Sequence, residues 1–369
     1  MLLLQFILNK CGIDPPCRYC PSNGSCWSRS FPESPHKKET FIMLTAIVLP
    51  AAFGFAVFML GMKLMEAALH RAAGRWLQAA IERFTRTPLH GLLTGAAASA
   101  VLQSSTAVTV IAIGMVNAGV MAFPRTIGIV LGTNIGTCLT TELIGLDLDR
   151  LAGPLLLLAL AGWLLTALLG EMSSSAGLRR QRWLRPLRSA SLVLGGFALI
   201  LSGIAVMKSI GDAVQNSLFF HWFMDRSGDS LLWGLLAGAA LTAAVHSSAA
   251  VIGMAMTLAA SGVLPMELGV AIVLGANVGT CLTAVLASIG GTRAGAKVAW
   301  FHVALNVGGA LLFLPFTGWL AAASAWFGGG PASQLAHAQT LFNVLCSLIV
   351  LPLCYIPRLR IPNKSPAPK

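Results

Sequence analysis

VLQSSTAVTVIA, residues 101–112, places four consecutive polar side chains inside an otherwise apolar segment. A second stretch, AVHSSAAVIGMA at residues 244–255, repeats the pattern. The polar residues of the two stretches are Gln103, Ser104, Ser105, Thr106, His246, Ser247 and Ser248. A buried hydroxyl or amide without a partner is costly. Two such clusters in matching surroundings indicate that these side chains bind a ligand.

The composition is that of a membrane protein. Of the 369 residues, 56% are hydrophobic and only 10% are charged, and the mean hydropathy is +0.77. Soluble domains carry about 25% charged residues. Apolar runs at 41–69, 123–146, 151–170, 188–207, 266–289, 296–321 and 335–356 are mostly long enough to cross a bilayer, which needs about 20 residues. A water-soluble enzyme is therefore excluded.

The two polar stretches belong to an internal duplication. GLLTGAAASAVLQSSTAV at 91–108 aligns with GLLAGAALTAAVHSSAAV at 234–251, and IVLGTNIGTCLT at 129–140 aligns with IVLGANVGTCLT at 272–283. Both alignments have the same offset and need no gap, so they indicate one duplicated unit. We expect membrane repeat 1 at 43–172, a basic cytoplasmic linker at 173–188, membrane repeat 2 at 189–356 and a basic cytoplasmic tail at 357–369.

Residues 1–42 form a tail with four cysteines, Cys11, Cys17, Cys20 and Cys26. We consider three interpretations of this tail: a disordered segment, a small disulfide-bonded or metal-binding lobe, or an upstream extension of a chain whose natural start is Met43.

Loop charge sets the expected topology. Arginines concentrate in 70–90 and 171–188, basic residues recur at 290–297 and in the C-terminal tail, and 211–233 is acidic. All basic loops fall on the cytoplasmic side only if both polar segments re-enter the membrane without crossing it. The sequence thus predicts an all-α polytopic membrane protein with about seven full spans and two re-entrant helical hairpins. The hairpins belong to two inverted repeats. The net charge of +12 is explained by these loops, so no nucleic-acid partner is expected.

The hairpin tips have the chemistry of an ion site. Helix N-termini direct unpaired N–H groups at anions, and hydroxyl and amide groups donate to anions or accept cations. The seven polar tip residues are therefore candidate anion ligands. A lone Ser-Ser pair would more simply bond to its own helix, but the copy in register favours a site.

A second duplicated motif, G-[TA]-N-[IV]-G-T, occurs at 132–137 and 275–280. Its glycines favour local unwinding and close approach of another backbone. The candidate cation ligands in it are Asn134, Thr137, Asn277 and Thr280.

Charged residues are scarce in the apolar segments. Lys63 and Glu66, one turn apart near the inner end of the first span, are expected to pair or to reach the interface. His302 with Asn306, and His337 with Asn343, are expected either to line a cavity or to join helices. Cys138 and Cys281 match across the duplication, and we expect them to serve packing.

QSSTAVT with GTNIGTCLT, and the second copy with SSAAV and GANVGTCLT, resemble the type II-like sodium/phosphate cotransporter family, including its bacterial members. FMLGMKLM, FHVALN and TLFN fit the same pattern, so the resemblance covers roughly 43–356. It implies a symporter, not an enzyme, that moves inorganic phosphate by alternating access around both tips. It also implies a multi-pass protein of the cell inner membrane.

The same resemblance implies phosphate, sodium and the lipid bilayer as partners. Sodium is the coupling ion, with no other metal or cofactor, and a homodimer is among the assemblies we consider. The sequence departs from the family at His246, where glutamine is common, and at Gln339, where histidine is expected.

Three other functions compete with this interpretation. A transporter of another oxyanion or of a dicarboxylate would need similar hairpins, and dicarboxylates usually need an arginine or aspartate at the site. A membrane phosphatase with re-entrant hairpins would need clustered carboxylates and an arginine. Neither hairpin carries an acid or an arginine. A passive channel is the third, and the inverted repeat favours alternating access over it.

Overall fold

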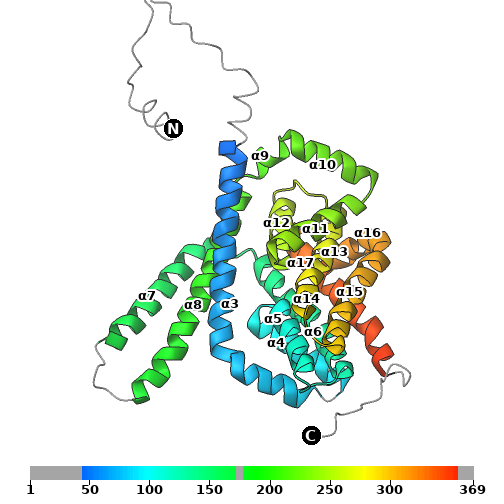
Figure 1. Cartoon of the computed structure of the whole chain (residues 1–369). Helices are drawn as coiled ribbons and strands as arrows, with labels where there is room; N and C mark the ends of the chain where they lie inside the picture. The colour runs from blue at the N-terminus through cyan, green and yellow to red at the C-terminus, as the bar shows by residue number, and fades with distance from the viewer. Residues whose placement is uncertain (1–43, 86, 172–177, 356–369) are drawn as a thin grey trace, which may run out of the picture. The chain divides into compact units, whose positions relative to one another are not determined.

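The computed structural model describes residues 44–85, 87–171 and 178–355 (Figure 1). The predicted tails, 1–42 with its cysteines and 357–369, lie outside the described residues. Within them every regular element is a helix, and seven segments are long and apolar enough to cross a membrane. These segments are Thr45–Ala73, Phe123–Gly145, Asp149–Leu169, Leu184–Lys208, Met266–Ser288, Arg293–Ala325 and Pro331–Tyr355. The predicted all-α membrane class is confirmed, and the number of candidate spans agrees with the expected seven; the inverted repeats and the re-entrant hairpins stay predictions.

The spans are built from long helices, some of them in two pieces. They are α3 (Leu49–Phe84), α6 (Phe123–Gly145), α7 (Ala152–Glu171), α8 (Leu178–Lys208), α13 (Met266–Gly279) with α14 (Cys281–Ser288), α15 (Arg293–Phe313) with α16 (Thr317–Ala325), and α17 (Pro331–Val350). Between α8 and the second polar segment lie α9 (Gly211–Gln215) and α10 (Leu218–Asp229). The described part of the basic linker forms the first turns of α8.

Each polar segment consists of two short helices that meet at the polar residues. The first has α4 (Pro88–Leu102) and α5 (Ser105–Asn117), and the second has α11 (Leu232–Val245) and α12 (Ser248–Ala260). Helices of this length reach about 20 Å, which is less than the roughly 30 Å of a bilayer core. None of these four short helices is long enough to span the membrane by itself. Re-entry from opposite faces stays a prediction.

The first helices of the two halves, α3 and α8, pack against each other (Figure 1). A Cβ added at Gly61 would lie 2.5 Å from the Gly196 carbonyl oxygen, and one at Gly203 would lie 2.6 Å from that of Gly54. The helices therefore run antiparallel. GFAVFMLGMKLM at 54–65 aligns with GFALILSGIAVM at 196–207, so Gly54 corresponds to Gly196 and Gly61 to Gly203. The repeat therefore converts one contact into the other. Two-fold related units produce this kind of exchange, which supports the inverted repeat.

Glycines hold each polar segment against the following span. A Cβ at Gly132 of α6 would lie 2.0 Å from the Leu92 oxygen of α4, and one at Gly275 of α13 would lie 1.9 Å from the Leu235 oxygen of α11. The expected close approach is thus present in both copies. The expected unwinding is not: α6 is continuous through its motif, and only the second copy is interrupted, at Thr280 between α13 and α14.

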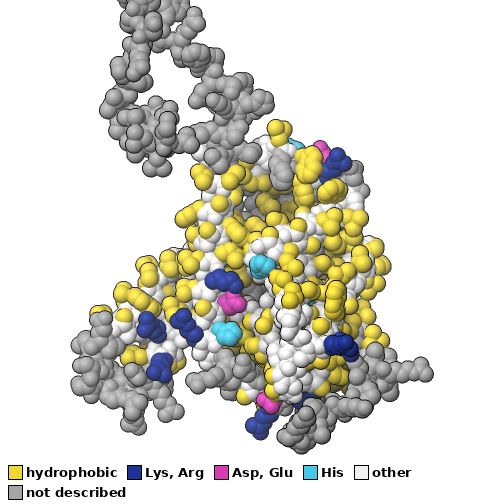
Figure 2. Space-filling model, viewed as in Figure 1, with side chains coloured by type: hydrophobic (Ala, Val, Ile, Leu, Met, Phe, Trp, Pro, Cys, Tyr) yellow, Lys and Arg dark blue, Asp and Glu magenta, His cyan; other side chains and the backbone are white. Residues whose placement is uncertain are grey.

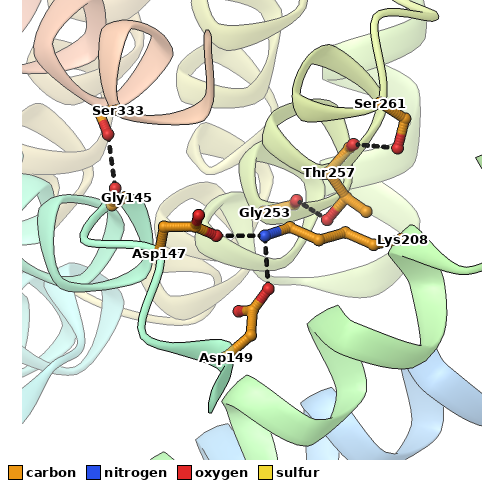
Figure 3. A network of polar contacts seen from close by, with 8 residues as sticks. All are labelled: Gly145, Asp147, Asp149, Lys208, Gly253, Thr257, Ser261 and Ser333. Carbon is orange, nitrogen blue, oxygen red and sulfur yellow. Dashed lines mark hydrogen bonds and ion pairs between the residues drawn. The ribbon is translucent and has the colours of Figure 1, made fainter. Parts of the chain in front are cut away.

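The C-terminal end of α6 is tied to two other helices (Figure 3). Lys208, the last residue of α8, forms ion pairs with Asp147 and Asp149 in the turn between α6 and α7. The Ser333 hydroxyl of α17 donates to the Gly145 carbonyl. In the expected topology this end of α6 lies on the outer side.

Most side chains on the face shown in Figure 2 are apolar, and charged ones are few. Strongly exposed apolar residues include Leu157, Leu158 and Trp300. Large exposed apolar surfaces mark membrane contact.

Candidate functional site

The two tips share one backbone conformation. Gln103 and His246 end α4 and α11 in the left-handed region, with φ of 54° and 57°. Ser104 and Ser247 follow in extended conformation, and each hydroxyl accepts the backbone N–H three residues on, at 3.3 Å. A left-handed residue ends a helix and a serine N-cap begins the next. The shared polar-Ser-Ser pattern therefore folds into the same tip twice.

Both tips line a single cavity of about 390 Å³. This volume is within the range of roughly 300–1,000 Å³ that is usual for ligand sites. All seven residues predicted as anion ligands line it: Gln103, Ser104, Ser105, Thr106, His246, Ser247 and Ser248. The fold thus brings together two segments that lie far apart in the chain.

The cavity receives the N-termini of two helices. Ser105 and Thr106 begin α5, and Ser248 begins α12. The first N–H groups of a helix have no partner in their own helix, and the helix dipole is positive at that end. The Ser104 oxygen accepts from its helix, so its hydrogen remains available as a donor. This arrangement suits a small oxyanion.

The two tips differ in how their first residue is held. The Thr140 hydroxyl donates to Gln103 Oε1 at 2.8 Å, and Gln103 Nε2 donates to the Ala100 carbonyl at 2.6 Å. Thr283 occupies the position of Thr140 in the second copy, but its hydroxyl donates to the Thr280 carbonyl. His246 is exposed. The site therefore has one fixed polar side and one adaptable side.

The structure divides the predicted cation ligands into two groups. Thr137 and Thr280 line the cavity, whereas Asn134 and Asn277 are buried outside it. Asn134 Nδ2 donates to Asn306 Oδ1 at 2.7 Å, and Asn277 Nδ2 donates to the Val273 carbonyl at 2.9 Å. The cation role of all four residues stays a prediction.

Sequence reasoning did not assign several cavity-lining residues. Thr140 and Thr283 end the duplicated GTCLT motif, so their repetition was the available signal. The α3 residues Met62, Lys63, Glu66 and His70 also line the cavity. Lys63 and Glu66 form the expected pair, with Nζ and Oε2 2.8 Å apart.

Asn306 and Asn343 join neighbouring helices. Asn343 Nδ2 donates to Cys138 Sγ at 3.3 Å, and Asn306 Nδ2 donates to Cys281 Sγ at 3.5 Å. Both thiols are buried, as expected for packing. Of the two interpretations left open for Asn306 and Asn343, the structure supports helix joining.

The two histidines of these helices differ. His302 is buried and does not line the cavity. His337 Nδ1 lies 2.9 Å from Glu142 Oε2 and links α17 to α6.

The spans, the duplicated tips and the shared polar cavity define an α-helical membrane transporter. The chain belongs to the Na+/Pi-cotransporter family, whose family model matches residues 57–209 and 199–330. Membership of this family makes the protein a transporter and not an enzyme.

Two relatives illustrate the similarity. The chain is 34% identical over 315 residues to the uncharacterized protein YqeW of Bacillus subtilis (strain 168), covering 85% of this chain and 94% of that protein. It is 26% identical over 310 residues to the "Putative inorganic phosphate export protein YjbB" of Escherichia coli (strain K12), covering 84% of this chain. The match spans 54% of YjbB, about half its length. No solved structure matches the chain.

Proposed function

We propose that this protein carries inorganic phosphate across the cell inner membrane, coupled to sodium, by alternating access around the two tips. The observation that carries the proposal is the single cavity lined by both serine-rich tips and by the N-termini of α5 and α12. Membership of the Na+/Pi-cotransporter family and the relative named as a phosphate exporter support phosphate as the cargo.

Sodium coupling is supported by the oxygen atoms beside the anion site. Thr137 and Thr280 line the cavity, and Glu66 adds its only carboxylate. The two threonine hydroxyls donate to the Thr133 and Asn277 carbonyls, which leaves their oxygen lone pairs for a cation. Hard cations prefer oxygen ligands. A bound cation would offset part of the charge of a phosphate dianion, which gives a physical reason for moving both ions together.

Alternating access is supported by the arrangement of the halves. The α3 and α8 glycine contacts exchange under the repeat, as expected for inverted halves. The contacts of Lys208 with Asp147 and Asp149 hold the expected outer end of α6. The α3 residues that line the cavity extend from Met62 to His70, the first residue of the arginine-bearing segment 70–90. We expect this segment on the cytoplasmic side.

Flux measurements test the proposal directly. The full chain is reconstituted in liposomes, and uptake and release of labelled phosphate are measured under a sodium gradient and under an equal potassium gradient. We expect flux that depends on sodium. Equal flux with both cations would refute sodium coupling, and absence of phosphate flux in either direction would refute phosphate transport.

Serine replacements test the site. Ser104→Ala with Ser105→Ala, and Ser247→Ala with Ser248→Ala, should each weaken phosphate binding by about tenfold or more, since each pair loses at least one hydrogen bond to a charged ligand. The matched control is Ser202→Ala with Ser324→Ala, because these hydroxyls donate to their own helices at Ala198 and Ala321 and lie outside the cavity. If both tip variants bind phosphate as well as this control does, the site assignment is wrong.

A further inference from the structure

The lysine and the acid that line the cavity lie inside a membrane span. Lys63 and Glu66 are on α3, and the span Thr45–Ala73 continues for about three helical turns beyond Lys63. The sequence had suggested a position near the inner end. Charged residues within a span are costly, and they usually mark an ion path or a binding site.

The pair is accessible and contributes little to stability. Lys63 Nζ lies 2.8 Å from Glu66 Oε2, and the two side chains are 63% and 24% exposed. Ion pairs in contact with water stabilise a fold weakly. In a water-filled cavity, stability does not explain why both charges stand in the membrane, and the lysine can change its partner at little cost.

The same pair holds all the formal charge of the cavity wall. Among the described residues that line the cavity, Lys63 is the only lysine or arginine and Glu66 is the only acid. The tips supply hydroxyls, an amide, an imidazole and helix N-termini. A phosphate dianion would thus find one full positive charge in the cavity, and that charge is already paired with Glu66.

We propose that the Lys63–Glu66 pair is an exchangeable contact that links anion binding to cation binding. When phosphate enters, the Lys63 ammonium leaves Glu66 and donates to a phosphate oxygen. The released Glu66 carboxylate then becomes a ligand for the cation. This inference rests on the proposed function and gives it a coupling element. By linkage, sodium and phosphate must tighten each other's binding by the same factor.

Binding of labelled phosphate to the purified full chain tests the exchange, with and without sodium, at about pH 8 so that ordinary histidines are neutral. Lys63→Gln should weaken phosphate binding by about tenfold or more, the change expected on losing a hydrogen bond to a charged group. Glu66→Gln should tighten phosphate binding without sodium, because Lys63 is then unpaired, and should abolish the stimulation by sodium. Lys63→Arg keeps the charge and should restore coupling.

Matched controls remove the same charges outside the cavity. Lys297 on α15 and Glu82 on α3 are exposed and do not line the cavity. The variants Lys297→Gln and Glu82→Gln should therefore bind phosphate as the wild type does. The inference is overturned if Lys63→Gln binds phosphate like Lys297→Gln, or if Glu66→Gln keeps the wild-type stimulation by sodium. Each variant is decisive alone, because the two shift the phosphate Kd in opposite directions. Wild-type protein that binds no phosphate would instead refute the proposed function.

Discussion

Gly132→Ala should damage both the stability of the protein and the first half of its site. The new Cβ would lie 2.0 Å from the Leu92 carbonyl oxygen, whereas ordinary contacts begin at about 3.4 Å, so α4 must move away from α6 by about 1.4 Å. Overpacking of this kind costs about 1–3 kcal/mol. Because Gln103 follows the last residue of α4 and α6 carries Thr140, the same shift pulls on their 2.8 Å hydrogen bond and weakens it.

The expected result is a lower thermal unfolding midpoint in detergent and weaker phosphate binding. Loss of the neutral hydrogen bond, about 0.5–1.5 kcal/mol, corresponds to roughly two- to tenfold in Kd. Gly308→Ala on α15 is the matched control, since a Cβ there meets nothing within 4 Å. Alanine is favoured over glycine in a helix by about 0.5–1 kcal/mol. Gly132→Ala protein that is as stable as Gly308→Ala and binds phosphate normally would contradict the reasoning.

Three further predictions concern single side chains. Thr140→Val should weaken phosphate binding about two- to tenfold by freeing Gln103, whereas Thr283→Val should have a smaller effect; equal effects on the phosphate Kd would contradict this. Asn306→Leu leaves a buried amide unpaired and should lower the free energy of unfolding by about 1–3 kcal/mol, seen as a lower thermal midpoint. Lys208→Met removes the cation shared by two carboxylates and should speed amide hydrogen exchange at 146–151; unchanged exchange would show that the ion pairs do not hold this turn.

The spans and the tips could be predicted because their signals are local. Spans require uninterrupted apolar length, which hydropathy measures directly. The tips require a residue able to adopt the left-handed conformation and a serine N-cap, and both are visible in QSS and HSS. The duplication in register added that two such tips exist. No local feature was needed beyond these.

The sequence could not predict which side of each helix faces the cavity and which side contacts another helix. In the window that defines the α6 span, 72% of the residues are buried, so no polar stripe distinguishes one side. Asn134 and Thr137 project only about 60° apart on this helix. One contacts α15 through Asn306 and the other faces the cavity. A difference of this size depends on helix packing and not on composition, and the same reason explains why the cavity position of Lys63 was missed.

The inequality of the two tips originates partly outside the tips themselves. In the first copy α6 is continuous, and the Thr140 hydroxyl donates to Gln103 Oε1. In the second copy Thr283 donates to the Thr280 carbonyl instead, so the second tip lacks the hydroxyl that would hold its first residue.

Gln103 therefore presents a fixed amide. Its oxygen is occupied and one N–H is bonded to Ala100, which leaves one N–H for an anion. His246, exposed on the same left-handed backbone, can rotate toward or away from the ligand. An anion in this cavity would be held in place from the first half, and the second half would adapt to it. The two duplicated tips therefore share a backbone design and differ in how firmly their first residue is held.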